Sequence, residues 1–260
     1  MFLLRQTIEE KIWQLIQNYA QERCIPVIWR RPVVRFADAK SAGFESLRQI
    51  VDPGHHVPED YLPGAQNVLS WFLPFLPEVG RNNLPGELCS AQWADSYLVT
   101  NEMAARINEQ LVAYIRNELG ADAAVPSDAG MIGMDNPRSR WSQRHVAYLA
   151  GHGTFGVNNM LISDVGSVGR YFSVVTTLDV QPDQPVMEER CLWKRDGSCC
   201  LCVKRCAAGA LTAEGFDRFK CLVQCLENMQ KYPGADVCGK CTVELPCSYE
   251  IPKIKTAGRK

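Results

Sequence analysis

Cysteine is the residue that most clearly marks this chain for chemistry. The sequence has 12 cysteines in 260 residues, and all but two of them lie between Cys191 and Cys247. Clustered thiols in a reducing compartment are metal ligands or redox groups more often than they are disulfides. The cysteine-rich segment therefore predicts a metal or redox centre.

The spacing of these cysteines divides them into two sets of four. A Cys-x2-Cys pair brings two thiolates to one centre. A cysteine four residues further on begins a helix, and in bacterial two-cluster ferredoxins it ligates the other cluster. The spacing therefore predicts two four-iron clusters with interleaved ligands. The first set is Cys191, Cys199, Cys202 and Cys247, and the second set is Cys206, Cys221, Cys238 and Cys241.

Other uses of the cysteines stay open at this point. A structural zinc ion needs four ligands and leaves half of the two sets unexplained. Its candidate ligands are Cys199, Cys202, Cys238 and Cys241. Disulfides are disfavoured in the cytosol. Cys200 and Cys225 fall outside both sets as bystander thiols, and Cys24 and Cys89 are expected to be buried apolar residues.

Length and composition limit the number of domains, the kinds of partner and the expected location of the protein. The chain is long enough for one sizeable core with an appendage, or for two modest domains. A net charge of −1 gives no basic field that points to nucleic acid, and we expect the basic run 29–35 to be a solvated edge. Neither a signal peptide nor a membrane span is predicted, so the expected location is cytoplasmic with no membrane partner.

Periodicity predicts a mixed order of elements. We expect helices over 5–20, 94–119 and 140–150, strands over 24–29 and 66–73, and a hairpin of 159–163 with 168–177. Loops are expected over 52–65 and 121–139. The Pro-Asp-Gln-Pro stretch at 182–185 marks a boundary between an α+β sandwich domain, 1–185, and a small helical module, 186–260, that its metal ligands hold together.

Three glycines precede the predicted hairpin. Gly151, Gly153 and Gly156 have the spacing of a dinucleotide-binding fingerprint. That fingerprint follows a strand and opens a helix, whereas here a helix precedes and a strand follows. The order excludes a Rossmann site. We expect the glycines to let the backbone approach a large flat ligand.

The chain at this point resembles the epoxyqueuosine reductases and their double-cluster relatives. The segments that carry the resemblance are LPGAQNVLSWFLPF (62–75), RHVAYLAGHGTFGVNNMLIS (144–163), GRYFSVVTT (169–177), the cysteine run from Cys191 to Cys206, and CGKCTVELPCSYEIP (238–252). The resemblance implies a nitroreductase-like α/β sandwich domain and a small ferredoxin-like, mainly helical module with two 4Fe-4S clusters. It also implies a bound cobalamin, to which electrons pass through the two clusters.

The resemblance assigns roles to residues as well. It implies a corrinoid surface formed by Gly151, His152, Gly153, Thr154, Phe155, Gly156 and Asn158. His152 is either an axial ligand or proton donor, or a hydrogen-bonded residue beside the site; the second is favoured because the family leaves the lower axial position without a protein ligand. The family's proton-donating aspartate corresponds to Asp135 or Asp128, with Asp135 the better fit by spacing.

Two functions follow from this reading. The leading expectation is a reductase that acts on a small molecule and receives electrons from a low-potential ferredoxin- or flavodoxin-type donor. A transfer-RNA substrate is not expected, because the helical repeats of the longer reductases do not follow the last cysteine. The alternative is an electron-transfer protein or an activator of corrinoid proteins, with no substrate of its own.

Overall fold

The centre of the protein is a four-stranded antiparallel sheet. The computed structural model describes residues 2–253. The strands lie in the order β1 (Val33–Asp38), β2 (Asn67–Pro74), β6 (Gly169–Thr176) and β3 (Ala123–Ala124). All eight residues of β2 are buried, since helices cover both faces of the sheet. The predicted strand over 66–73 is confirmed.

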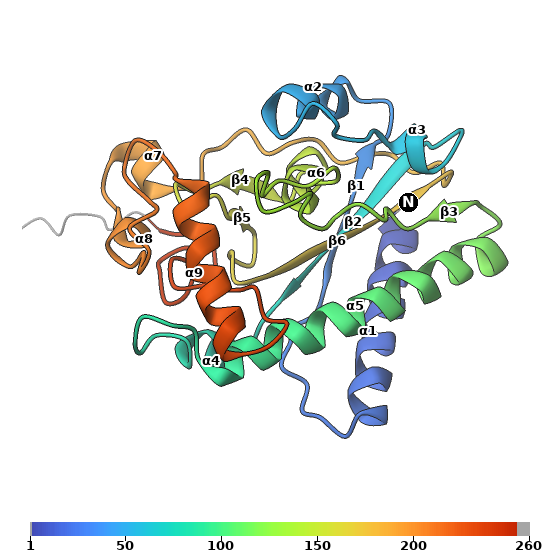
Figure 1. Ribbon diagram of the computed structural model, residues 1–260. Coiled ribbons are helices and arrows are strands. Elements are labelled where there is room, and N and C mark those ends of the chain that lie inside the picture. Colours follow the sequence, from blue (N-terminus) through green and yellow to red (C-terminus); the bar gives the residue numbers. More distant parts are fainter. Residues whose placement is uncertain (1, 254–260) are drawn as a thin grey trace, which may run out of the picture.

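Two long helices cover one face of the sheet, and shorter helices cover the other (Figure 1). α1 (Phe2–Glu22) and α5 (Ala91–Glu118) contact each other and pack on the side of Leu69, Trp71 and Leu73. α2 (Ala42–Ile50) and α6 (Gln143–Leu149) pack on the opposite face. Side chains along a strand alternate between its faces, so both cores come from one strand. The predicted α+β class is confirmed, and so are the three predicted helices, which correspond to α1, α5 and α6.

The predicted hairpin of 159–163 with 168–177 is wrong. β5 (Leu161–Ser163) pairs instead with β4 (Gly153–Phe155) in a separate two-stranded sheet. β6 crosses the central sheet between β2 and β3. A run that is apolar on both faces suits a central strand as well as a hairpin strand, and the sequence does not distinguish the two.

The predicted strand over 24–29 is also wrong, because the edge strand begins four residues later at Val33. Cys24 is exposed rather than buried and ends the turn after α1 with a φ of 52°. The basic run 29–35 is not a simple solvated edge. Arg30 donates to the carbonyl oxygens of Val165 and Tyr249, at 3.0 and 3.2 Å.

Two short helices lie in the loops that follow β1 and β2. α3 (Pro58–Tyr61) lies within the predicted loop over 52–65, and α4 (Pro77–Arg81) follows β2. The loop expected over 121–139 is irregular apart from the two residues of β3. None of the described helices is both long and apolar enough to cross a membrane.

The cysteine-rich segment is mainly helical, as predicted. It contains α7 (Leu192–Asp196), α8 (Leu201–Lys204) and α9 (Arg218–Lys231). It packs against α4 and α5, where Asn83 donates to the Cys238 carbonyl at 2.8 Å and Gly239 lies against the Trp93 ring. Ala235 and Val243 belong to the same core as α1 and α5. The division at residue 185 stays a prediction.

Candidate iron–sulfur site

The first set of cysteines comes together at one hollow. Cys191, Cys199, Cys202 and Cys247 all line it, although Cys247 is 45 residues from its nearest partner in the sequence. The hollow is small, with about 20 Å³ open to a water-sized sphere, and its other walls include Gly156, Asn158, Ile162, Leu192, Trp193, Leu245 and Pro246. This wall contains no charged side chain.

The thiols of the first set are close enough to affect one another's ionisation. Burial and the neighbouring thiolate of Cys191 together raise the pKa of Cys202 to about 11. Burial raises the pKa of Cys247 to about 12, with Cys191 and Cys202 adding to the effect. Cys200 also lines the hollow. Four or more thiolates in one hollow repel one another, so the arrangement favours a positively charged centre among them.

The second set gathers beside α9. The pKa of Cys241 is raised to about 12, mainly by burial. The neighbouring thiols of Cys238, Cys221 and Cys206 contribute to this rise. Burial likewise raises the pKa of Cys238, to about 11. Cys225 lies one helical turn after Cys221 and neighbours both Cys221 and Cys238. The fold therefore brings each predicted set of four together, and each set has one additional cysteine nearby.

The zinc ligands expected from the sequence fall in different sets. Cys199 and Cys202 line the hollow of the first set, whereas Cys238 and Cys241 neighbour each other in the second. Tetrahedral zinc needs four ligand atoms within about 2.3 Å of the metal. A four-iron cube spreads its four cysteine ligands more widely, because each binds a different iron. The two sets stay candidate ligands of four-iron clusters.

The glycines before β5 contact protein rather than open space. A side chain at Gly151 would meet the carbonyl oxygen of Gln184, and one at Gly153 would meet that of Ile162. Thr154 is buried and donates to Glu189 at 3.1 Å. These positions let the 181–190 segment and β5 pack closely, and the expectation that they approach a large flat ligand stays a prediction.

His152 is a buried neutral residue of the core. Its Nε2 lies 3.2 Å from the carbonyl oxygen of Ser70, and its ring packs edge-on against Tyr171. Burial lowers the pKa of His152 to about 3. The ring is enclosed between α6 and the sheet, which agrees with the hydrogen-bonded alternative rather than with an axial ligand.

The remaining predicted corrinoid residues lie nearer the cysteines. Gly156 and Asn158 line the hollow of the first set. Phe155 packs against the rings of His145 and Tyr148, with ring centres 4.8 and 5.9 Å away. These three residues form the end of the glycine segment, and two of them, Gly156 and Asn158, line the hollow.

The two candidate aspartates differ in their surroundings. Asp128 is half-buried and accepts hydrogen bonds from the Tyr61 hydroxyl at 3.3 Å and the Ser127 hydroxyl at 3.1 Å. Tyr61 packs edge-on against the buried ring of Trp141. Asp135 is exposed on the loop. Asp128 is therefore held in place while Asp135 lies on an exposed loop, and the choice between the two stays a prediction.

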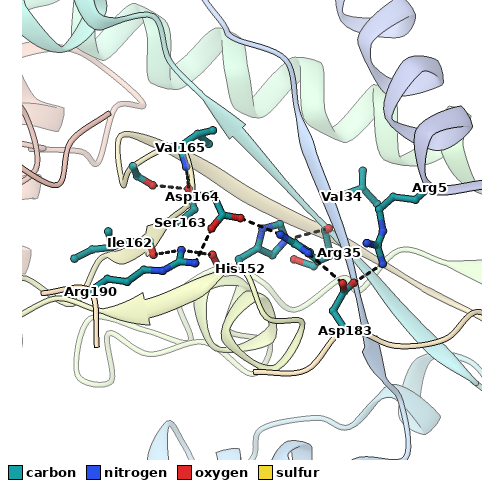
Figure 2. Close-up of polar contacts among 12 residues, drawn as sticks. Arg5, Val34, Arg35, His152, Ile162, Ser163, Asp164, Val165, Asp183 and Arg190 are labelled. Carbon is teal, nitrogen blue, oxygen red and sulfur yellow. Dashed lines mark hydrogen bonds and ion pairs between the residues drawn. The ribbon is translucent and has the colours of Figure 1, made fainter. Parts of the chain in front are cut away.

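A chain of alternating charges fastens the 181–190 segment across the protein (Figure 2). Asp183 lies between Arg5 of α1 and Arg35 of β1, at 2.8 and 3.2 Å. Asp164 lies between Arg35 and Arg190, at 2.9 and 2.6 Å. Arg190 is buried and also donates to the carbonyl oxygens of His152 and Ile162. This network fixes Cys191, the next residue, beside β4 and β5.

No pattern in the sequence predicts this network, or Asn158 as a link between the sets. Salt-bridge partners that are 26 to 178 residues apart in the sequence have no spacing rule. The Asn158 side chain donates to the Cys241 carbonyl at 2.7 Å while it lines the hollow of the first set.

Comparison with solved structures agrees with this architecture. An epoxyqueuosine reductase bound to an epoxyqueuosine-modified tRNA-Tyr stem loop superposes with a TM-score of 0.54 at 16% identity, over 94% of this chain and 68% of that one. The Bacillus subtilis enzyme, with its catalytic aspartate loop swung out of the active site, gives 0.53 at 16% identity, over 93% and 67%. The chain has the fold of the epoxyqueuosine reductases.

The same fold extends to a second class of reductase. A catabolic reductive dehalogenase superposes with a TM-score of 0.52 at 17% identity, over 84% of this chain but only 30% of its own. No family model matches the sequence, and a search of curated proteins finds no relative. At these identities the likeness to the epoxyqueuosine reductases and dehalogenases concerns the fold alone.

Proposed function

We propose that this chain is an iron–sulfur reductase with two four-iron clusters, one on each set of cysteines. The observation that carries this proposal is the grouping of eight cysteines into the same two sets of four that their spacing predicts. When bound, such clusters supply one-electron transfer at low potential. The protein's own contribution is to hold the thiols, exclude water and keep the two centres adjacent.

Metal analysis tests the proposal directly. Anaerobically purified protein should be brown and contain about eight irons and eight sulfides per chain with no zinc. Zinc in place of iron, or no metal after reconstitution with iron and sulfide, would overturn the proposal.

A corrinoid fits this chain less well than the clusters do. Gly151, His152, Gly153 and Thr154 are packed against protein, which leaves Phe155, Gly156 and Asn158 as the part of the predicted surface beside a hollow. We therefore derive no step through cobalamin. Titration of the reconstituted protein with cobalamin, followed by gel filtration, tests binding; a stoichiometric complex would restore the corrinoid proposal.

For the reductase itself, we propose Asp128 as the proton donor and a small molecule as the substrate. Conversion should be assayed with a low-potential ferredoxin or flavodoxin as donor. Two molecules bound in structures of the fold neighbours serve as test compounds. They are an epoxyqueuosine-modified stem loop and 3-bromo-4-hydroxybenzoic acid. We expect no binding of the stem loop. Asp128→Asn should abolish the reduction of an accepted small molecule, while Asp135→Asn should leave it intact.

An electron carrier without its own substrate is the second candidate. The closed packing around Gly151 and His152 favours it, because a carrier needs no cofactor cavity in that part of the domain. A protein that holds both clusters, converts neither small molecules nor RNA, and passes electrons from the donor to a corrinoid protein would support this candidate over the reductase.

A further inference from the structure

Cations gather around one of the two cysteine sets and not around the other. We propose that this asymmetry separates the two clusters in potential: the second set holds the higher-potential cluster, and the first set holds the lower-potential one. The inference rests on the proposed function, and it concerns the order in which the two centres accept electrons.

Arg218 is the first of the cations at the second set. It precedes Cys221 by three residues on α9, so the two side chains share a face of the helix. The Arg218 guanidinium lies over the aromatic ring of Phe216. No carboxylate within the described chain lies at ion-pair distance from Arg218. The guanidinium charge is therefore free to act on the cysteine side chain beside it.

Arg144 approaches the same set from α6. It donates to the Asn159 carbonyl at 2.6 Å, and the adjacent Asn158 binds the Cys241 carbonyl. Cys221 and Cys241 are among the groups that act electrostatically on Arg144. Arg144 has no acidic partner among residues 2–253, and it faces the like charge of Arg218. Two arginines without carboxylates are costly to keep together unless a negative centre lies between them.

Lys240 supplies a third cation. It stands between Cys238 and Cys241 in the sequence and is buried, with 5% of its surface exposed. Its Nζ donates to the carbonyl oxygens of Asn83 and Pro85, each at 2.7 Å, and to no carboxylate. Neutral carbonyls orient the ammonium group and leave its charge uncompensated.

Hydrogen-bond donors to sulfur occur at both sets and do not distinguish them. At the second set, the backbone N–H of Ala210 donates to the Cys206 Sγ at 3.2 Å, and the Thr242 hydroxyl lies 3.9 Å from the Cys241 Sγ. At the first set, the Val203 backbone N–H acts on the Cys202 thiol, and the Ser167 hydroxyl lies beside the Cys247 thiol and donates at 3.0 Å to the Cys247 carbonyl oxygen. Donors that point at cluster sulfurs stabilise the reduced state.

The cations near the first set are neutralised or exposed. Arg190 pairs with Asp164, and Arg195 pairs with Asp196. Lys194 and Lys204 are exposed, so solvent screens their charges. The hollow itself has an uncharged and largely apolar wall.

Reduction of a four-iron cluster adds one electron and no proton, so its net charge becomes more negative by one. Fixed positive charge and hydrogen bonds favour that change, whereas an apolar wall without cations opposes it. The cysteines of both sets are half-buried, so solvent exposure does not distinguish them. The first electron delivered to the protein should therefore remain on the second set.

Redox titration of the reconstituted protein, followed by electron paramagnetic resonance, tests the inference. The wild-type protein should show two one-electron steps. Arg144→Gln and Arg218→Gln should each lower the higher potential, by about tenfold in the reduction equilibrium or ~59 mV for one electron. The lower potential should stay unchanged. Arg144→Lys and Arg218→Lys keep the charge and should stay close to wild type.

Lys204→Gln is the matched control, because it removes an exposed cation near the first set and should move neither step. A shift of the lower step in the arginine variants, or no shift of either step in protein with its full iron content, would overturn this inference alone. Protein without iron after reconstitution would overturn the proposed function together with it.

Discussion

The Asn158 side chain joins the two cysteine sets: its Nδ2 donates to the Cys241 carbonyl at 2.7 Å, and the residue lines the hollow of the first set. Its Oδ1 accepts from the backbone N–H of Met160 at 3.2 Å. One buried amide therefore fixes β4 and β5 to a turn of the second set.

Asn158→Leu should destabilise the protein by about 1–3 kcal/mol, because the Cys241 carbonyl and the Met160 N–H lose their partner in a buried place. Thermal unfolding under anaerobic conditions measures the change. Iron content should fall for both clusters together, since the amide contacts both sets. A variant as stable as the wild type, or one that loses only the first cluster, would contradict this role.

Arg190→Met should destabilise the protein by about 3 kcal/mol. The change leaves the carbonyl oxygens of His152 and Ile162 without a donor and removes the 2.6 Å partner of Asp164. Arg31→Met is the matched control, because Arg31 pairs with Glu10 at the surface and should cost less than about 1 kcal/mol. Denaturant unfolding measures the free energy of unfolding of both variants. Equal losses of stability in the two variants would argue against the network.

His152 should make stability fall as the pH is lowered. The folded protein keeps the ring neutral, with its pKa lowered to about 3, whereas the unfolded chain takes up a proton near pH 6.5. The contribution is therefore complete above pH 6.5 and is lost toward pH 3. Between pH 7.5 and 6.0 this residue accounts for about 0.8 kcal/mol.

Thermal unfolding at pH 7.5 and 6.0 checks the histidine prediction. His152→Gln should show a smaller loss of stability across this interval than the wild type, because glutamine does not titrate. The nearby charges of Arg35, Asp164 and Arg190 are present in both proteins and cancel in the comparison. An identical pH dependence in the two proteins would show that the pKa of His152 does not change on folding.

Single cysteine variants should separate ligands from bystanders. Cys199→Ser should lose the cluster of the first set, and Cys206→Ser that of the second, so each retains about four of eight irons. Cys200→Ser is the matched control beside Cys199 and should retain both clusters. Iron loss in Cys200→Ser with retention in Cys191→Ser would instead assign Cys200 to the first set.

The sequence by itself determined the division of the cysteines, the α+β class and the longest helices. Local spacing carries these features: four residues separate Cys202 from Cys206 and turn the second thiol away from the first, and the 3.6-residue period marks α1 and α5. The sequence did not predict the position of β6 in the sheet or the residue at which β1 begins, because strand pairing depends on partners elsewhere in the chain.

Only the tertiary structure decided what surrounds each centre. It packs Gly151 and His152 against protein, holds Asp128 in place, and brings Arg144, Arg218 and Lys240 to one cysteine set. Burial and charge at a site come from segments far apart in the sequence. They are therefore fixed by packing, whereas ligand spacing is fixed by the local chain.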